Sequence, residues 1–317
     1  MKSFILTISL LHFITFFALA QDKKTEADDH YKKLEEKYKR LKDSLALTPF
    51  IPAVSSVIIN YQQIEVNFFT SLISTNKYRD DHGQLLDINA RQTYLYNTVQ
   101  VNYGVSKNAR FNVGLNINSI FGRIDQDRNS SPFKVFGSDA TGNSRYARAI
   151  TSIGPRVGWR PFKNNYNFTV QSSFSFPAFV STEDENILGR RQIYFLAQFL
   201  YNQPLSKRLF LFSQLSTQYG FERDNAPAVF YTPVSVYLSY LIPRKTILFA
   251  LFNYVPVFTK NDSWTYNRYI TQVGGGVQYQ ISRHFLINTY YAANIKGKNY
   301  PDFDSYNISL RYISLKH

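Results

Sequence analysis

Residues 101–118 read VNYGVSKNARFNVGLNIN, which is an alternating run, a short basic turn and a second alternating run. In the second run the residues at 111, 113, 115 and 117 are apolar, and those between them are Asn or Gly. A period of two predicts β-strands with one apolar and one polar face. Because the polar face is uncharged, it fits a narrow wet interior better than the outer face of a soluble β-sandwich.

This unit recurs along the chain. Short basic turns lie at 106–110, 206–208, 243–245 and 282–284, and longer polar stretches alternate with them. Membrane-spanning β-barrels alternate short periplasmic turns with longer outer loops in the same way. The pattern therefore predicts an all-β fold, a closed antiparallel transmembrane β-barrel over residues 51–317.

Period-two runs predict about twelve strands in this barrel. They are expected at 61–76, 91–106, 109–122, 147–160, 166–179, 191–203, 208–221, 229–242, 246–258, 268–281, 285–296 and 304–315. An even number places both termini on the periplasmic side. Pro155 removes a ladder donor within its strand, so we expect a bulge or break there.

The longer connections are then predicted at the outer end of the barrel. They are 77–90, 123–146, 180–190, 222–228, 259–267 and 297–303. Because the stretch 123–146 contains two Gly and several Ser and Asn residues, it is the expected mobile or ligand-contacting loop.

The first 20 residues have the features of a signal peptide, with Lys2 before an apolar stretch that ends on Ala20. The stretch is short for the alternative, an uncleaved membrane anchor. The chain has no Cys, which excludes disulfides and a lipid anchor on Cys. No later stretch approaches the roughly 20 apolar residues of a spanning helix, so strands must hold the chain in any membrane.

Residues 21–50 are a predicted charged amphipathic periplasmic helix and linker. An apolar seam spaced by three and four consists of Tyr31, Leu34, Tyr38, Leu41 and Leu45. An isolated helix of this length is marginal, so the seam predicts a partner surface: the barrel's underside, its lumen or a second protein. The alternative is a solvated, fraying linker.

The net charge of +14 falls mostly in the periplasmic turns and the lumen, because the outer loops carry both signs. Strand parity places five charged residues on inward faces near the periplasmic ends: Glu65, Arg110, Arg156, Arg160 and Arg311. We expect them to form a lumen constriction. Since the first and last strands pair when a barrel closes, we also expect contact between Glu65 and Arg311.

These charges have two interpretations. They can stiffen the lumen, or they can form a basic constriction that favours anionic solutes or receives Glu35 and Glu36 of the predicted helix. Nucleic acid binding is not expected, because the aromatic residues follow the strand period and do not interleave with a basic face.

The sequence predicts no enzyme, metal site or cofactor. Among the His residues only His82 lies in a predicted outer loop, beside Asp80 and Asp81, and a solvated loop residue is the expected role. The run Gly274-Gly275-Gly276 precedes no helix, so it is not a phosphate-binding loop. We expect these glycines to permit strand bending or close approach of side chains.

From Tyr61 onward the chain, especially residues 101–113, resembles predicted outer-membrane transporters, including the meta-pathway phenol-degradation family. Its Asn-, Tyr- and Lys-rich composition resembles that of envelope proteins of Gram-negative Bacteroidota. The resemblance implies a barrel and passage of small, sometimes aromatic, solutes. It does not include residues 22–47.

Two functions follow for a protein of the bacterial outer membrane, in contact with its lipid and lipopolysaccharide. The first is a narrow, porin-like channel or transporter for small solutes. The alternative is a non-conducting barrel subunit of a larger assembly, secretion or uptake complex that docks protein partners through its N-terminal helix.

Overall fold

A computed structural model gives the fold of the chain. The structure describes residues 58–137, 144–163, 165–189, 191–223, 226–242, 245–260 and 263–314. The predicted signal peptide, and the predicted helix with its seam from Tyr31 to Leu45, lie outside the described residues. No helix in the described ranges is long and apolar enough to cross a membrane.

The described residues form thirteen strand segments. They are β1 Ile64–Arg79, β2 Leu85–Gly104, β3 Phe111–Asp125, β4 Ser144–Trp159, β5 Phe168–Pro177, β6 Tyr194–Pro204, β7 Leu209–Gly220, β8 Val229–Tyr231, β9 Val234–Ile242, β10 Thr246–Lys260, β11 Trp264–Gln280, β12 Phe285–Lys298 and β13 Tyr300–Ile313. Two short helices, η1 Pro132–Phe136 and α3 Glu185–Leu188, lie in the connections β3–β4 and β5–β6.

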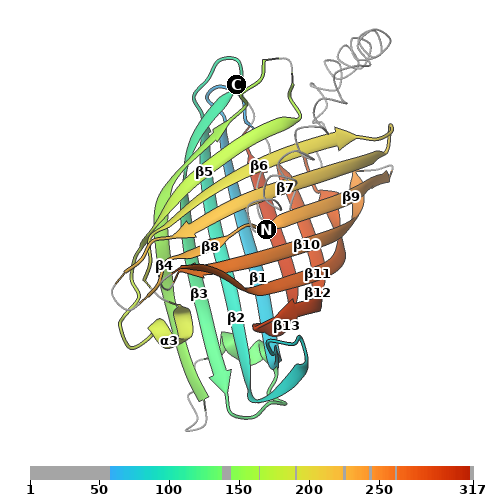
Figure 1. Ribbon diagram of the computed structural model, residues 1–317. Coiled ribbons are helices and arrows are strands. Elements are labelled where there is room, and N and C mark those ends of the chain that lie inside the picture. Colours follow the sequence, from blue (N-terminus) through green and yellow to red (C-terminus); the bar gives the residue numbers. More distant parts are fainter. Residues whose placement is uncertain are drawn as a thin grey trace. The chain divides into compact units, whose positions relative to one another are not determined.

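The strands close into a barrel (Figure 1). Segments β8 and β9 each pair with both β7 and β10, so they are two parts of one strand, interrupted at Thr232 and Pro233. All pairings are antiparallel, β1 pairs with β13, and β10 pairs with β11. The predicted closed antiparallel barrel of twelve strands is confirmed.

Short and long connections alternate less strictly than predicted. The expected loop 77–90 is mostly strand, because β1 and β2 continue to a tight turn at 80–84. Likewise β12 and β13 leave only Asn299 between them, which has a φ of +49°. The period of two, which placed the predicted strand ends, stops before these positions, but strands can continue beyond an apolar zone when their ends are polar.

The strand that contains Pro155 is real and runs unbroken from Ser144 to Trp159. It pairs with β5 at Ile153 and again at Arg156, but not at the two residues between them. The register is the same on both sides. The expected break is therefore a local gap in the ladder where Pro155 has no N–H to donate.

The barrel is polar inside and apolar outside. On β1 and β2, Asn67 and Gln100 are buried while the neighbouring Phe68 and Val101 are exposed. The alternation predicted for β3 is also confirmed, since Asn116 is buried and Leu115 is exposed. A soluble protein has the reverse arrangement, so the outer wall suits hydrocarbon and the inner wall suits water.

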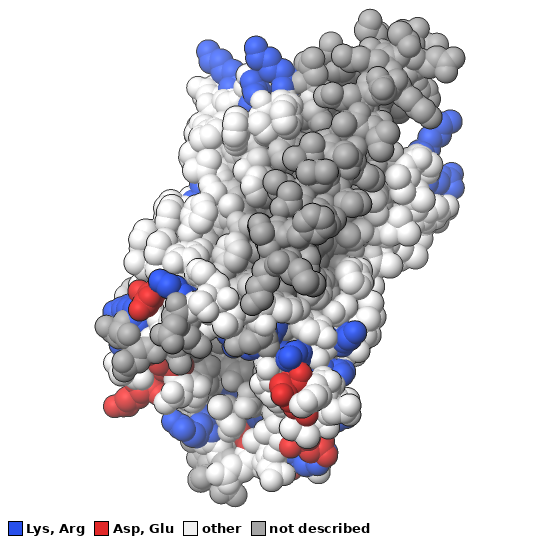
Figure 2. All heavy atoms as spheres, in the orientation of Figure 1, with Lys and Arg blue, Asp and Glu red and all other residues white. Residues whose placement is uncertain are grey.

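Charges and tryptophans mark the two ends of the barrel. Figure 2 shows Lys and Arg at the upper end, both signs at the lower end, and few charged atoms among the described residues between the two ends. Both Trp residues are exposed: Trp159 closes β4 at the short-turn end, and Trp264 opens β11 at the other end. Aromatic residues at two levels are typical of the interfaces of a membrane barrel.

One sector of the inner wall is apolar. A buried cluster from β6, β7, β9, β10 and β12 contains Leu200, Phe212, Tyr237, Phe249, Leu251 and Ala292, with Tyr290 against it. The rings of Phe249 and Tyr290 lie 6.1 Å apart, although β11 runs between their strands. They meet because Gly276 has no side chain: a Cβ there would lie 2.4 Å from the Cβ of Tyr290.

We predict that Gly276→Ala destabilises the barrel by about 1–3 kcal/mol, because the added methyl overpacks the cluster. The matched control is Gly275→Ala on the opposite face, where a Cβ would meet only the carbonyl oxygen of Phe249 at 3.1 Å. The measurement is the temperature at which the folded band is lost in unboiled gel electrophoresis. Equal losses in both variants would contradict the role given to Gly276.

Candidate lumen constriction

Glu65 joins three strands at the short-turn end of the lumen. It begins the inward face of β1 and is 0% exposed. Its Oε1 accepts a hydrogen bond from Nε of Arg311 on β13 at 2.5 Å, and its Oε2 accepts one from Nδ2 of Asn102 on β2 at 2.8 Å. The predicted contact between Glu65 and Arg311 is confirmed, and it bridges the strands that close the barrel.

Arg156 adds a second buried cation to this level of the lumen. Gly114 on β3 pairs with Arg156 on one side and with Asn102 on the other. A Cβ on Gly114 would lie 2.5 Å from Oδ1 of Asn102. The guanidinium donates to Oε1 of Gln171 and lies within electrostatic range of Glu65. Together with Arg311 the level has two cations for one carboxylate, a net charge of +1.

Arg110 and Arg160 lie at the rim, next to the strand ends. The Nη2 of Arg110 donates to the carbonyl oxygens of Arg160 at 3.1 Å and Pro161 at 2.6 Å. In return, Nη1 of Arg160 donates to the carbonyl of Ala109 at 3.3 Å. Both side chains are only half buried, and these contacts tie two neighbouring short turns together. Thus three of the five predicted residues meet at one level, and these two lie beside it.

A segment before β1 narrows the same end and was not expected from the sequence. Ile58 and Ile59 are 3% and 2% exposed. A Cβ on Gly158 would lie 2.8 Å from Cδ1 of Ile58, and a Cβ on Gly104 would lie 1.9 Å from the carbonyl oxygen of Asn60. Both glycines belong to inward-facing rows of the sheet. Residues 58–60 therefore press against the inner wall.

The other end of the lumen is narrowed by the connection that contains α3. Ile187 and Leu188 are buried with Val180 and Ala147, against partly buried Tyr94, Ile120, Ile124 and Ala149. Gly122 occupies an inward position of β3, opposite Tyr94 on β2. It leaves the space that Ile187 fills, because a Cβ at Gly122 would lie 2.5 Å from Cγ2 of Ile187. The described part of this connection therefore turns into the lumen.

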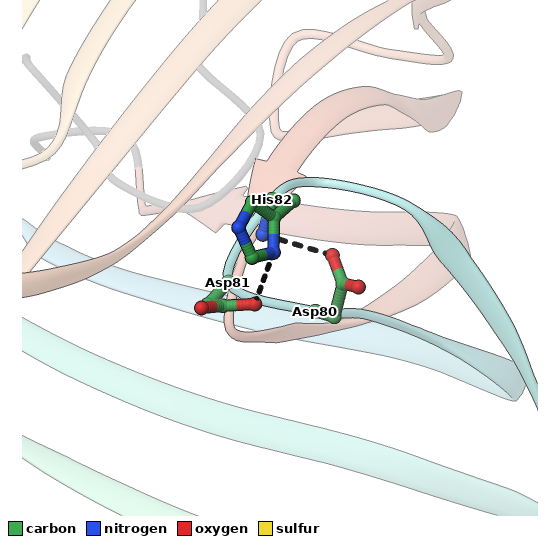
Figure 3. Close-up of side chains that lie close together, drawn as sticks. All are labelled: Asp80, Asp81 and His82. Atoms are coloured by element: carbon green, nitrogen blue, oxygen red, sulfur yellow. Dashed lines mark hydrogen bonds and ion pairs between the residues drawn. The ribbon is translucent and has the colours of Figure 1, made fainter.

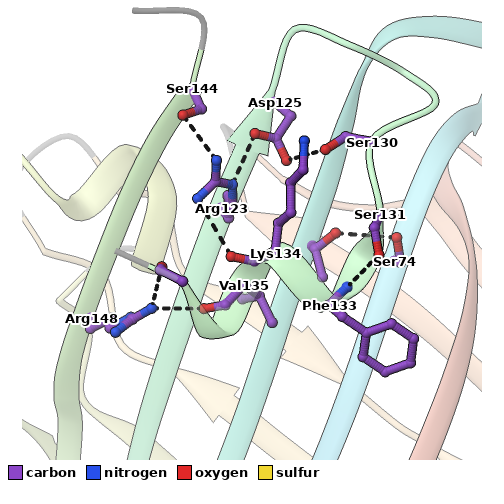
Figure 4. Close-up of polar contacts among 12 residues, drawn as sticks. Ser74, Arg123, Asp125, Ser130, Ser131, Phe133, Lys134, Val135, Ser144 and Arg148 are labelled. Atoms are coloured by element: carbon purple, nitrogen blue, oxygen red, sulfur yellow. Dashed lines mark hydrogen bonds and ion pairs between the residues drawn. The ribbon is translucent and has the colours of Figure 1, made fainter. Parts of the chain in front are cut away.

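The described part of 123–146 is fixed on the outer wall instead (Figure 4). Val135 of η1 is buried with Leu72 and Leu95, which share their face with exposed residues such as Phe68. Nη2 of Arg148 donates to the carbonyl oxygen of Val135 at 2.9 Å, and Nη1 of Arg123 donates to that of Lys134 at 3.4 Å. Together with the packing of Val135, these contacts hold η1 on the outer wall of the barrel.

His82 belongs to a turn and not to a built site (Figure 3). Its Nδ1 lies 2.6 Å from Oδ1 of Asp81, and both side chains are well exposed. The Oδ1 of Asp80 accepts hydrogen bonds from the backbone N–H groups of His82 at 2.9 Å and Gln84 at 2.8 Å. The three residues could converge on a cation, but the geometry is that of a turn stabilised by Asp80.

The fold is similar to that of solved barrels. An outer membrane channel from Pseudomonas putida F1 superposes with a TM-score of 0.64 and 10% sequence identity, over 83% of this chain and 100% of that chain. The β domain of a Bordetella autotransporter superposes with a TM-score of 0.50 and 10% identity, over 80% of this chain and 99% of that chain. No protein-family model and no curated protein matches the sequence. These similarities therefore concern the fold.

We predict that Glu65→Ala lowers the free energy of unfolding by about 3–5 kcal/mol, because it removes a carboxylate beside the buried cation of Arg311. Replacing both residues by Met should recover most of the loss. Urea unfolding in detergent micelles, followed by tryptophan fluorescence, measures these changes.

The control is Asp87→Ala, which breaks an exposed ion pair with Arg128, 3.2 Å between Oδ2 and Nη1. Its expected cost is below about 1 kcal/mol, because water screens the pair. If Glu65→Ala costs no more than this control, the seam contact does not stabilise the closed barrel.

Proposed function

We propose that the protein is a narrow channel for small solutes in the bacterial outer membrane. The observation that carries the proposal is the inverted barrel, with an apolar outer wall and a polar lumen that contains Glu65, Arg311 and Arg156 at one level. Because β1 begins and β13 ends at the short-turn end, that end would face the periplasm. The outer wall would contact lipid and lipopolysaccharide.

The constriction favours small anions over cations in this proposal. Two guanidinium groups and one carboxylate leave a net positive charge in a buried ring, which repels cations that pass through it. The turns at the same end add Lys and Arg, as the upper end of Figure 2 shows. Arg110 and Arg160 belong to that basic approach, beside the constriction itself.

Reversal potentials in planar bilayers test this selectivity. The wild type should pass chloride in preference to potassium, and Arg156→Ala should lower that permeability ratio about fivefold, since one charge about 4 Å from an ion in water contributes about 1 kcal/mol. The control Lys207→Ala, in an exposed short turn, should change it little. An unchanged ratio in Arg156→Ala would remove the selectivity.

One observation favours the alternative, a non-conducting barrel that anchors a larger envelope complex. The lumen contains fully buried apolar side chains, with Leu200 at 0% and Phe212 at 1% exposure, and Ile58 and Ile59 occupy its short-turn end. In that proposal the sequence at 22–47, with its seam from Tyr31 to Leu45, docks a protein partner.

Deleting residues 22–47 separates the two functions. For a channel, the purified full chain and the deletion variant both conduct in planar bilayers, because the barrel residues form the path. For an anchoring subunit, neither form conducts, and proteins that co-purify with the full chain from native membranes are lost on deletion. Mass spectrometry of the two pull-downs identifies them.

A further inference from the structure

A second basic residue faces the lumen in the half opposite the short turns. Arg268 lies near the start of β11 and pairs in register with Val257 on β10, which pairs with Tyr231 on β8. Val257 is 0% exposed and belongs to the inward row of β10, together with Leu251. Because paired residues share a face of the sheet, Arg268 and Tyr231 point into the lumen.

Two more tyrosines reach this place from other parts of the wall. Tyr96 on β2 belongs to the same inward row as Gln100. In the closed strand order β2 lies opposite β8, yet Tyr96 is within electrostatic range of Tyr231. Tyr300, the first residue of β13, is within electrostatic range of Tyr231 and Arg268. These four side chains therefore narrow the lumen, and we name Tyr96, Tyr231, Tyr300 and Arg268 the tyrosine constriction.

Solvent reaches the tyrosine constriction. Tyr96 exposes 38% of its surface although it faces inward, so the lumen beside its ring is open to water. Tyr231, Tyr300 and Arg268 are partly exposed as well. The level of Glu65 differs, since that carboxylate is 0% exposed. A solute in the lumen can therefore touch the tyrosine constriction without displacing packed side chains.

The described residues at this level have a net positive charge. Arg268 donates from Nη2 to Oγ1 of Thr259 at 3.1 Å, which is a neutral acceptor. Arg79 pairs in register with Tyr300, but its charge is balanced, because its Nε lies 2.7 Å from Oδ1 of Asp302. One cation, Arg268, therefore remains among three phenol groups.

This set of donors fits an oxyanion. A guanidinium presents its N–H groups in a planar fork that matches two oxygens of a carboxylate or phosphate, and each phenol can donate one O–H. A cation would be repelled by Arg268, and an apolar solute would take water from the guanidinium without supplying an acceptor. Pores for anions and phosphate use Arg and Lys side chains in the same way.

We propose that the tyrosine constriction is a binding site for a small oxyanion of the phosphate or carboxylate class. The inference rests on the proposed channel, since an oxyanion reaches the site through the lumen. Arg311 and Arg156 form the other positive level, at the short-turn end. An anion that crosses the barrel would meet one positive level in each half.

Calorimetric titration of the full chain in detergent micelles at neutral pH tests the site, with inorganic phosphate and acetate as separate probes. Saturable binding of at least one is expected, and the one that binds more tightly gives the class. Arg268→Gln should weaken it about tenfold or more, because it removes charge-assisted hydrogen bonds. Tyr231→Phe keeps the ring and removes one donor, so about fivefold weakening is expected.

The matched control is Tyr254→Phe on the outer wall, whose hydroxyl lies 2.7 Å from that of Tyr266. Its oxyanion affinity should be that of the wild type, and unboiled gel electrophoresis checks that every variant is folded. Arg156→Ala should weaken binding less than Arg268→Gln does. The opposite order would place the oxyanion at the level of Glu65 and overturn the inference, and so would the absence of saturable binding of both probes.

Bilayer current from the same preparation keeps the two proposals apart. Current without oxyanion binding overturns the site at the tyrosine constriction alone. Binding that Arg268→Gln weakens, without current, overturns the channel and leaves the oxyanion site.

Discussion

The structure depends on closure of the sheet between its first and last strands. In hydrocarbon an unpaired backbone N–H or C=O has no water to bind, so a membrane-spanning sheet must leave no edge. Here β1 pairs with β13 along most of its length, and side chains reinforce the seam at the short-turn end. Glu65 binds Arg311 within the lumen, and Gln63 donates from Nε2 to the carbonyl of Ser314 at 3.1 Å.

Closure also explains why so much of the barrel could be predicted from the sequence. Once a strand has a period of two, its inward and outward residues are known, and closure fixes which strands neighbour the first and the last. The contact between Glu65 and Arg311 follows from these two rules alone. Strand ends were harder, because near Lys77 and Asp87 the apolar face stops while the strand continues, so the period no longer marks it.

The inward segments could not be predicted, for a different physical reason. Ile187 and Leu188 are an apolar pair within a charged stretch, and Ile58 and Ile59 are a second apolar pair. Two residues are too few to show a strand or helix period. The glycines that receive them, Gly122 and Gly158, do signal close approach within a strand. Which part of the chain approaches is decided by tertiary packing, and a single sequence does not encode it in a local pattern.

The lumen is filled in part by side chains of the strands and in part by two short segments that lie on the wall. Different parts of the chain would have to move to open each region. The aromatic cluster around Phe249 consists of strand side chains held over Gly276, so displacing it disturbs the wall itself. Residues 58–60 and α3 are short segments laid on the wall, and the strand ladders close without them. If the lumen widens, it therefore does so by moving these segments. Moving residues 58–60 opens space at the short-turn end, near Glu65, and moving α3 opens it at the other end, near Gly122.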